Sequence, residues 1–276
     1  MQPTVKSLRQ GSKVLIGKYS VDNLAEPVPI SWTKATPNGD FIATNTLDFL
    51  CFDAKEQAVR DNGSTYMGPG NPNYLLSNIH CFLNSTETSW YIPQHTNDNA
   101  PSRQYSDIEG HIGTYADHCG FLYHFEEFEL NCILPQTFTV GEDQITSKIR
   151  LPKLADVFGD SKFNLFKKKG VRAHPSVDLI DRKGRMTGYE GEVQFMPYFL
   201  ADKHDRFASS VSILDRMGYV SYSTPARAHG IRPTCKIRLD AKVEEIADGI
   251  YELIPFDVQP MAVGTTEEIL ALLGLV

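Results

Sequence analysis

The sequence predicts an α+β fold in which mostly antiparallel sheets are accompanied by two or three helices and long irregular loops. Three observations lead to this prediction. Apolar and polar residues alternate with a period of two in residues 13–52 and again in 209–239, as in half-buried strands. Helical spacing of apolar residues occurs in 74–83 and 121–134. Residues 85–118, which lie between these helices, carry isolated aromatic residues and prolines and show no period.

The N-terminal part of the chain is expected to form strands followed by one helix. A turn at Asn38-Gly39-Asp40 supplies the positive φ that a tight hairpin needs. The Gly-, Asn- and Pro-rich residues 60–72 are expected to form a loop. In the helix at 74–83, Leu75, Ile79 and Phe82 share one buried face. The predicted strands are residues 13–19, 28–34 and 41–52.

The second half is expected to contain one longer helix and several hairpins. The helix at 121–134 ends at Pro135, which cannot continue it. Pro233 cannot donate to a sheet ladder, so the last predicted strand of the hairpin region, 230–239, begins at this proline or lies at an edge there. The other predicted elements are strands at 137–140, 145–151, 209–214 and 218–223, a short helix at 154–158, and a strand pair within 241–256 that turns at Asp248-Gly249.

Composition limits the class of protein. The chain has 276 residues, of which 41% are hydrophobic and 11% aromatic, so it can bury a full core and is not globally disordered. A net charge of −7 disfavours a general nucleic-acid binder, which needs a basic face. The first residues lack the apolar core of a signal peptide, and no run reaches the roughly 18 apolar residues of a membrane helix. We therefore expect synthesis in a reducing cytoplasm and no nucleic-acid or membrane partner.

Histidines and cysteines are concentrated in residues 80–124, but their spacing matches no common metal site. His118 and His124 are separated by six positions with Cys119 between them, and no Cys-x-x-Cys pair occurs. Asn97-Asp98-Asn99 has the ligand types that suit calcium, but the sequence offers no partner set. No nucleophile, phosphate-loop or dinucleotide motif is present. These observations predict no metal, no cofactor, no enzymatic activity, and five reduced cysteines that serve as core residues.

Tyrosine, arginine and histidine gather in and beside the hairpin at 209–223. Such residues suit recognition, because they combine a large contact area with a polar tip. The alternative is that Tyr198, Tyr219 and Tyr222 are ordinary residues facing the sheet. The candidate ligand-binding residues are Tyr198, His204, Arg206, Tyr219, Tyr222, Arg227 and His229.

An ordered set of short motifs resembles a known family. The motifs are Lys13-Val14-Leu15-Ile16-Gly17-Lys18-Tyr19, Ile30-Ser31-Trp32, residues 75–84, Trp90-Tyr91, Pro93-Gln94-His95, Gly120-Phe121-Leu122, Lys148-Ile149-Arg150-Leu151-Pro152, Tyr198-Phe199-Leu200 and Gly230-Ile231-Arg232-Pro233. In this order they are similar to the domain of unknown function 6273 family, over residues 8–240. The chain departs from the family at Ala201-Asp202-Lys203, where Arg-Ser-Pro is usual. Any role tied to that arginine is therefore not expected here.

The resemblance implies a C-type-lectin-like domain, which we place at residues 7–256. Residues 257–276 are expected to be a linker and a helical tail with a nearly continuous apolar face. The tail either packs back on the domain or docks on a neighbouring subunit, and the second outcome is the one we expect. Members of the family are frequent in phages and prophages of Gram-positive bacteria. The expectation is thus a non-enzymatic virion protein, of the head-decoration, fibre or tail-adhesin type. Its partners would be other virion subunits or copies of itself, and a glycan or protein of the host surface.

A second interpretation stays open beside the first. A long irregular stretch inside a compact domain is often functional. Residues 85–118 would then form the site of a cytoplasmic enzyme or of a sensor for a small ligand.

Overall fold

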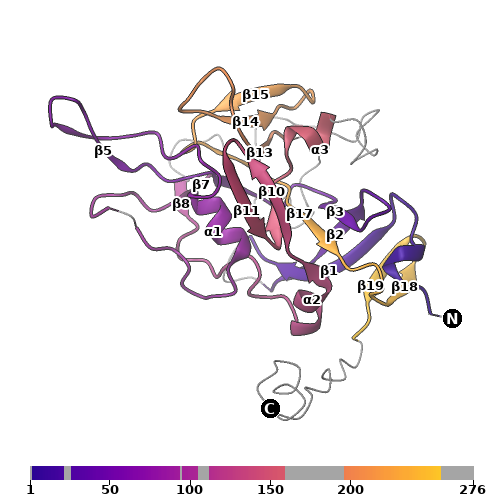
Figure 1. Cartoon of the computed structure of the whole chain (residues 1–276). Coiled ribbons are helices and arrows are strands. Elements are labelled where there is room, and N and C mark those ends of the chain that lie inside the picture. The colour runs from indigo at the N-terminus through magenta and orange to yellow at the C-terminus, as the bar shows by residue number, and fades with distance from the viewer. Residues whose placement is uncertain (1, 22–25, 94, 105–111, 159–195, 256–276) are drawn as a thin grey trace, which may run out of the picture.

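The computed structural model describes residues 2–21, 26–93, 95–104, 112–158 and 196–255 (Figure 1). In this part of the chain, two large and mostly antiparallel sheets carry most of the regular structure, and three short α-helices accompany them. The coarse prediction of a largely antiparallel α+β fold is therefore confirmed. The predicted tail at 257–276 lies outside the described residues.

The first sheet has eight strands and contains both the first and the last strand of the described chain. Its order is β12-β17-β3-β2-β1-β19-β18, and β9 pairs with β17 beside this path. Strand β1 pairs in parallel with β19, so the N-terminal strand is held by the end of the domain. The strands are β1 (Lys13–Tyr19), β2 (Val28–Lys34), β3 (Asp40–Ala43), β9 (Ile133–Leu134), β12 (Ile149–Arg150), β17 (Thr234–Ile237), β18 (Val243–Ala247) and β19 (Ile250–Leu253).

The second sheet has seven strands in the order β15-β14-β13-β16-β4-β7-β8. The predicted late hairpin forms one side of it, with β15 as the outermost strand. One apolar core, which includes Trp32, Phe52 and Phe199, takes residues from both sheets. The strands are β4 (Asp48–Cys51), β7 (Ser102–Gln104), β8 (Ile112–Thr114), β13 (Tyr198–Lys203), β14 (Val211–Leu214), β15 (Val220–Ser223) and β16 (Ala228–Ile231).

Two predicted strands are each divided between the two sheets. The predicted strand 41–52 is β3 of the first sheet followed by β4 of the second, and the run 230–239 contains the end of β16 followed by β17. The alternation of apolar residues continues through the second crossing, where residues 231–234 stay buried, whereas the first crossing contains the polar and only partly buried residues Thr44 and Asn45. Strand β17 begins directly after Pro233, as the missing N–H of proline requires.

The two crossings lie side by side and bond to each other. The Ala43 N–H donates to Pro233 O at 2.8 Å, and the Leu47 N–H donates to Ile231 O at 2.9 Å. The approach is so close at Gly230 that an added Cβ would lie 2.6 Å from Thr46 Cγ2. Glycine is therefore required at this position.

The helices are short and lie beside strands of the two large sheets. Helix α1 (Asn78–Asn84) begins where the Ser77 hydroxyl accepts a hydrogen bond from the His80 N–H, so the predicted helix at 74–83 starts later than expected. Helix α3 (Leu154–Phe158) agrees with its prediction. A short 3-10 helix, Val5–Ser7, precedes the first strand.

The prediction of a helix over 121–134 was wrong for its first half. Only Glu127–Cys132 is helical (α2), and residues 121–125 form successive turns. Phe121, Leu122 and Phe125 are nevertheless buried, because the turns place them against the core. The Phe121 N–H donates to Phe82 O at 3.0 Å, so the end of α1 takes the bond that a helix would have supplied. Burial alone therefore produced the helical spacing.

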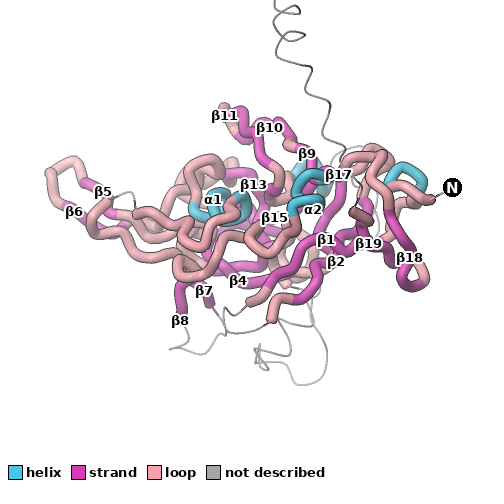
Figure 2. The backbone as a smooth tube through the Cα atoms, turned by 90° about the horizontal axis from the view of Figure 1, so that it is seen from below, coloured by secondary structure: helices cyan, strands magenta, loops and turns pink. Residues whose placement is uncertain are grey.

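Two small hairpins complete the fold. Strands β10 (Gln136–Val140) and β11 (Asp143–Ser147) form the predicted hairpin, with Gly141 at φ 60° in the turn. The predicted strand 145–151 does not continue beyond Ser147, because Ile149–Arg150 form β12 of the first sheet. Strands β5 (Gln57–Val59) and β6 (Thr65–Met67) form a hairpin where a loop was predicted. Figures 1 and 2 both show this hairpin, which we call the arm, extending away from the two large sheets.

Candidate functional site

Three rings form a cluster beside the late hairpin, in which Phe207 and Tyr222 are exposed and His204 is mostly covered. His204 follows β13, Phe207 lies in the loop to β14, and Tyr222 lies in β15. The His204 and Phe207 rings stack with centroids 5.3 Å apart, and Phe207 lies 4.5 Å from Tyr222. The loop is held by the His204 N–H, which donates to Ser210 O at 3.0 Å. The sheet therefore positions an aromatic platform at its outer side.

Exposed apolar side chains are concentrated in the same short stretch. Phe207 is 44% exposed, Tyr222 is 51% exposed and Tyr219 is 69% exposed. Met217 and Val220 are also exposed. In the described part of the chain, β15 pairs only with β14, so its outer backbone edge carries no further strand. We call these five residues together with His204 the hairpin face.

Four of the predicted ligand-binding residues lie at or beside the surface of this region, in addition to His204. Tyr219 and Tyr222 belong to the hairpin face. Arg206 is exposed in the loop that carries Phe207, and Arg227 is exposed after β15. The sequence prediction missed Phe207, Met217 and Val220. Phe207 and Met217 each follow an Asp-Arg pair in an irregular stretch of the sequence. A large apolar residue in such a stretch is not expected to be buried, and this signal could have identified both.

The remaining two predicted residues are buried, which corrects their assignment to a binding surface. Tyr198 is fully buried beside Leu214, and the Arg232 guanidinium lies 5.6 Å from its ring centroid. His229 is buried in β16, where its Nε2 lies 2.8 Å from Ser223 Oγ. Burial, aided by the charge of Arg227, lowers the pKa of His229 to about 4. Both side chains stabilise the sheet from within.

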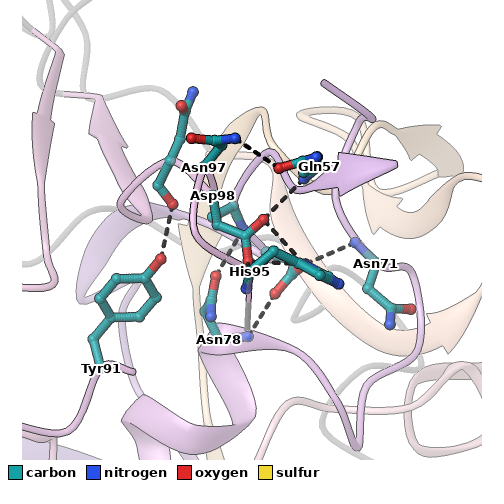
Figure 3. A network of polar contacts seen from close by, with 10 residues as sticks. Gln57, Asn71, Asn78, Tyr91, His95, Asn97 and Asp98 are labelled. Carbon is teal, nitrogen blue, oxygen red and sulfur yellow. Dashed lines mark hydrogen bonds and ion pairs between the residues drawn. The ribbon is translucent and has the colours of Figure 1, made fainter. Parts of the chain in front are cut away.

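The irregular region 85–118 uses its polar groups to hold the base of the arm (Figure 3). Asp98 Oδ1 accepts the Gln57 N–H at 2.8 Å, and Asp98 Oδ2 accepts the His95 N–H at 2.7 Å. Asn97 Nδ2 donates to Gln57 Oε1 at 2.9 Å. The Tyr91 hydroxyl donates to Asn99 O at 2.9 Å. The Asn97-Asp98-Asn99 group that suggested calcium ligands thus bonds largely to protein groups.

A buried carboxyl lies beneath these contacts. Asp53 accepts the Asn71 N–H at 2.7 Å and the Asn78 N–H at 2.8 Å. The Asp53 carboxyl is also hydrogen-bonded to the carboxyl of Glu56. Burial, reinforced by the Glu56 charge and opposed by the two N–H bonds, raises the pKa of Asp53 to about 7. We call Asp53, Glu56 and Gln57, together with residues 95–99, the arm root.

A buried charged group ties the irregular region to both sheets. The Arg103 guanidinium in β7 forms an ion pair with Asp48 in β4, and both side chains are fully buried. The Tyr19 hydroxyl in β1 donates to Asp48 Oδ2 at 2.6 Å. Arg103 Nη1 lies 2.7 Å from His118 Nε2. The group links a strand of the first sheet to two strands of the second.

A cavity of about 310 Å³ opens next to this group. Cys119 Sγ and His124 Nε2 lie 3.5 Å apart on its wall. The lining residues are Tyr19, Ser20, Pro27, Thr88, Asp117, His118, Cys119, Gly120, Phe121, Tyr123 and His124. The histidines and the cysteine that the sequence placed near one another therefore meet at one cavity.

The five cysteines are all free, but they do not all belong to the core. Cys51, Cys132 and Cys235 are buried as predicted, whereas Cys81 is exposed and Cys119 is partly exposed. Within the described ranges, no group of three or more histidine, cysteine, aspartate or glutamate side chains is arranged to hold a metal ion.

None of the helices in the described part of the chain is both long and apolar enough to cross a bilayer. Comparison with known proteins found no matching family model, no matching curated protein and no matching solved structure.

Proposed function

We propose that this protein is a non-enzymatic binding protein that recognises its partner through the hairpin face. The observation that carries the proposal is the platform of the exposed Phe207 and Tyr222 rings, which pack on the mostly covered His204 ring at the outer strand of a sheet. Exposing several aromatic rings to water is unfavourable unless a partner covers them. Aromatic anchors together with an arginine such as Arg206 are the residue types that dominate binding energy at interfaces.

The rigidity of the platform supports the same function. Strands β13, β14 and β15 are paired, and Tyr198 and His229 fill the sheet behind them. Side chains that are already ordered lose less conformational entropy on binding. A surface of this kind can bind without first reorganising.

The family resemblance supports a proposal about the setting in which this protein binds its partner. It suggests a C-type-lectin-like fold and a virion protein of the head-decoration, fibre or tail-adhesin type. Other virion subunits, further copies of the chain or a host surface glycan or protein would then cover the hairpin face. Fold analogy alone does not determine function, so the experiment must measure binding directly.

Binding of the purified chain to itself and to purified Gram-positive cell walls tests the proposal. The Phe207→Ser/Tyr222→Ser double variant should weaken self-association or cell-wall retention, measured by analytical ultracentrifugation and by pelleting. The matched control is Ile92→Ser/Ile246→Ser, which removes two exposed apolar side chains far along the chain from the hairpin. Equal binding by both double variants and the native chain would contradict the proposal.

A second candidate function is that of a small-ligand sensor or an enzyme. The cavity favours it, because Thr88, Asp117 and His118 of the irregular region line the wall beside Cys119 and His124. A cavity of about 310 Å³ is at the lower end of the usual range for small-molecule sites, roughly 300–1,000 Å³. A thermal-shift screen with a metabolite panel tests this candidate. A stabilising compound whose effect is lost in Thr88→Val would favour it over the first.

A further inference from the structure

Cys119 and His124 are brought together by the turns that replace the predicted helix. The Tyr123 N–H donates to Gly120 O at 3.0 Å, and the Phe125 N–H donates to Leu122 O at 3.1 Å. These bonds fold the chain back within five residues, so the imidazole returns to the thiol at 3.5 Å. The turn begins at Gly120, where an added Cβ would lie 2.3 Å from Ser85 O. The pairing is thus fixed by the backbone.

The surroundings of the two accessible thiols differ. Cys119 has an imidazole beside it, and both groups line the cavity. Cys81 lies on α1, where partial desolvation by the surrounding chain and the carboxylate of Asp53 both raise the pKa of its exposed thiol. A negative charge close to a thiol disfavours the thiolate, which is the nucleophilic form. Of the two, Cys119 has a base beside its sulfur, and this is the difference that favours its reaction.

The protonation states of Cys119 and His124 suit a proton donor and a base. Burial raises the pKa of the Cys119 thiol, so at neutral pH it holds its proton. Burial, together with the charge of Lys18, lowers the pKa of His124, so its imidazole is neutral. A neutral imidazole next to a protonated thiol can accept the proton as the sulfur attacks, which is how an adjacent base activates a nucleophile.

We propose that Cys119 is a reactive thiol that attacks small disulfides entering the cavity, and that His124 Nε2 accepts its proton. Cys119 Sγ forms a new S–S bond with one sulfur of the disulfide R–S–S–R, and the original S–S bond breaks. Cys119 is oxidised to a mixed disulfide, and the departing sulfur is reduced to the thiol R–SH. The proton passes from Cys119 to His124 and then to the departing sulfur, so the step balances.

The cavity indicates the size and chemistry of the disulfide. Its volume of about 310 Å³ admits a small molecule. Phe121 and Tyr123 supply apolar wall, and Ser20 and Thr88 supply hydroxyl groups. A low-molecular-weight disulfide with short polar ends fits this lining. This inference is independent of the hairpin face, on which the proposed binding function rests.

The test treats the full-length chain with bis(2-hydroxyethyl) disulfide and follows mixed-disulfide formation by intact mass and peptide mapping. Cys119 should be modified before Cys81. His124→Gln should slow modification of Cys119 by roughly 10²-fold, the lower end of what a general base contributes, and leave Cys81 unchanged. His95→Gln serves as the matched control, since this histidine lies at the arm root, and it should leave both rates unchanged.

A denaturant control separates reactivity created by the fold from intrinsic reactivity. In concentrated urea, the preference for Cys119 over Cys81 should disappear, because the imidazole is no longer held at the sulfur. The melting temperature of His124→Gln, measured in parallel, shows whether the variant is folded. Modification of Cys81 at the same rate as Cys119 in the folded chain, or an unchanged Cys119 rate in a folded His124→Gln variant, would overturn the proposal.

Discussion

The arm root and the hairpin face are both built beside hairpins, yet they use their side chains in opposite ways. At the arm root, Asp98 and Asp53 accept backbone N–H groups from within the chain. At the hairpin face, Phe207 and Tyr219 leave nearly half or more of their surface exposed. The irregular region is therefore polar for internal reasons, and the hairpin face is apolar without an internal reason. This difference supports the binding function that we propose for the hairpin face.

This difference makes predictions about stability as well as binding. A side chain that satisfies the interior should be costly to remove, while a side chain reserved for a partner should cost little. Substitutions in the two regions therefore test this difference directly.

The largest effect is expected at Arg103, which anchors the irregular region to Asp48. Arg103→Met leaves the Asp48 carboxylate buried without its cation, which should lower the free energy of unfolding by about 3–5 kcal/mol. Urea unfolding followed by circular dichroism measures this. Arg206→Met removes an exposed arginine and should change the free energy by less than about 0.5 kcal/mol. If the two variants were equally stable, the irregular region would not be tied down as described.

An intermediate effect is expected from pH, through Asp53. Its folded pKa of about 7 lies above the ordinary value of 3.8, so the folded state holds this proton more tightly than the unfolded state does. The stabilisation is full below about pH 4 and is lost as the pH rises through about 7. At roughly 1.4 kcal/mol per pKa unit, unfolding free energy should fall by about 2–4 kcal/mol between pH 4 and pH 8 from this group.

The Asp53→Asn variant isolates that contribution. Its amide cannot ionise, so the pH profile should be flatter than that of the native chain. The amide nitrogen cannot accept an N–H bond, so the variant should also lose about 1–3 kcal/mol at acidic pH. Guanidinium unfolding at pH 5 and pH 8 checks both expectations. A slope as steep as the native one would assign the pH dependence to other groups.

The smallest effect on stability is expected at the hairpin face. Tyr219→Ser removes a side chain that is 69% exposed, so unfolding free energy should change by less than about 0.5 kcal/mol. A buried counterpart, Tyr198→Ser, should cost several times more because it opens a cavity in the sheet. Differential scanning calorimetry compares the two. A large loss in Tyr219→Ser would place that ring in the interior instead.

Local patterns predicted most of the strands, because period-two alternation reports which side of a strand is buried. The hairpins at 137–147 and 211–223 followed from alternation and from glycines in turns such as Gly141 and Gly218. Alternation could not show where a strand changes sheets. At Arg232 the chain stays buried and the alternation continues through the crossing, and at the other crossing the polar residues 44–46 are equally consistent with a simple turn.

The candidate sites were less predictable than the fold. Tyrosine and histidine residues of the late hairpin have the same local sequence character, but Tyr198 and His229 face the interior while Tyr222 faces water. Which face is covered depends on strands far away in the sequence. The meeting of Cys119 with His124 was hidden for a related reason. Their separation of five residues suits neither a helix face nor a strand face, and only the turns after Gly120 join them.

The paired crossings between the sheets have a consequence for synthesis on the ribosome. Arg232 Nε donates to Ala43 O at 3.0 Å, across 189 positions of sequence. The N-terminal strands therefore leave the ribosome long before the strands that pair with them have been synthesised. During this time their apolar side chains are exposed to water. Contacts so distant along the chain make folding slow and leave nascent strands open to wrong pairings. Chaperone demand during translation should accordingly persist until β17 and the strands after it, β18 and β19, have left the exit tunnel.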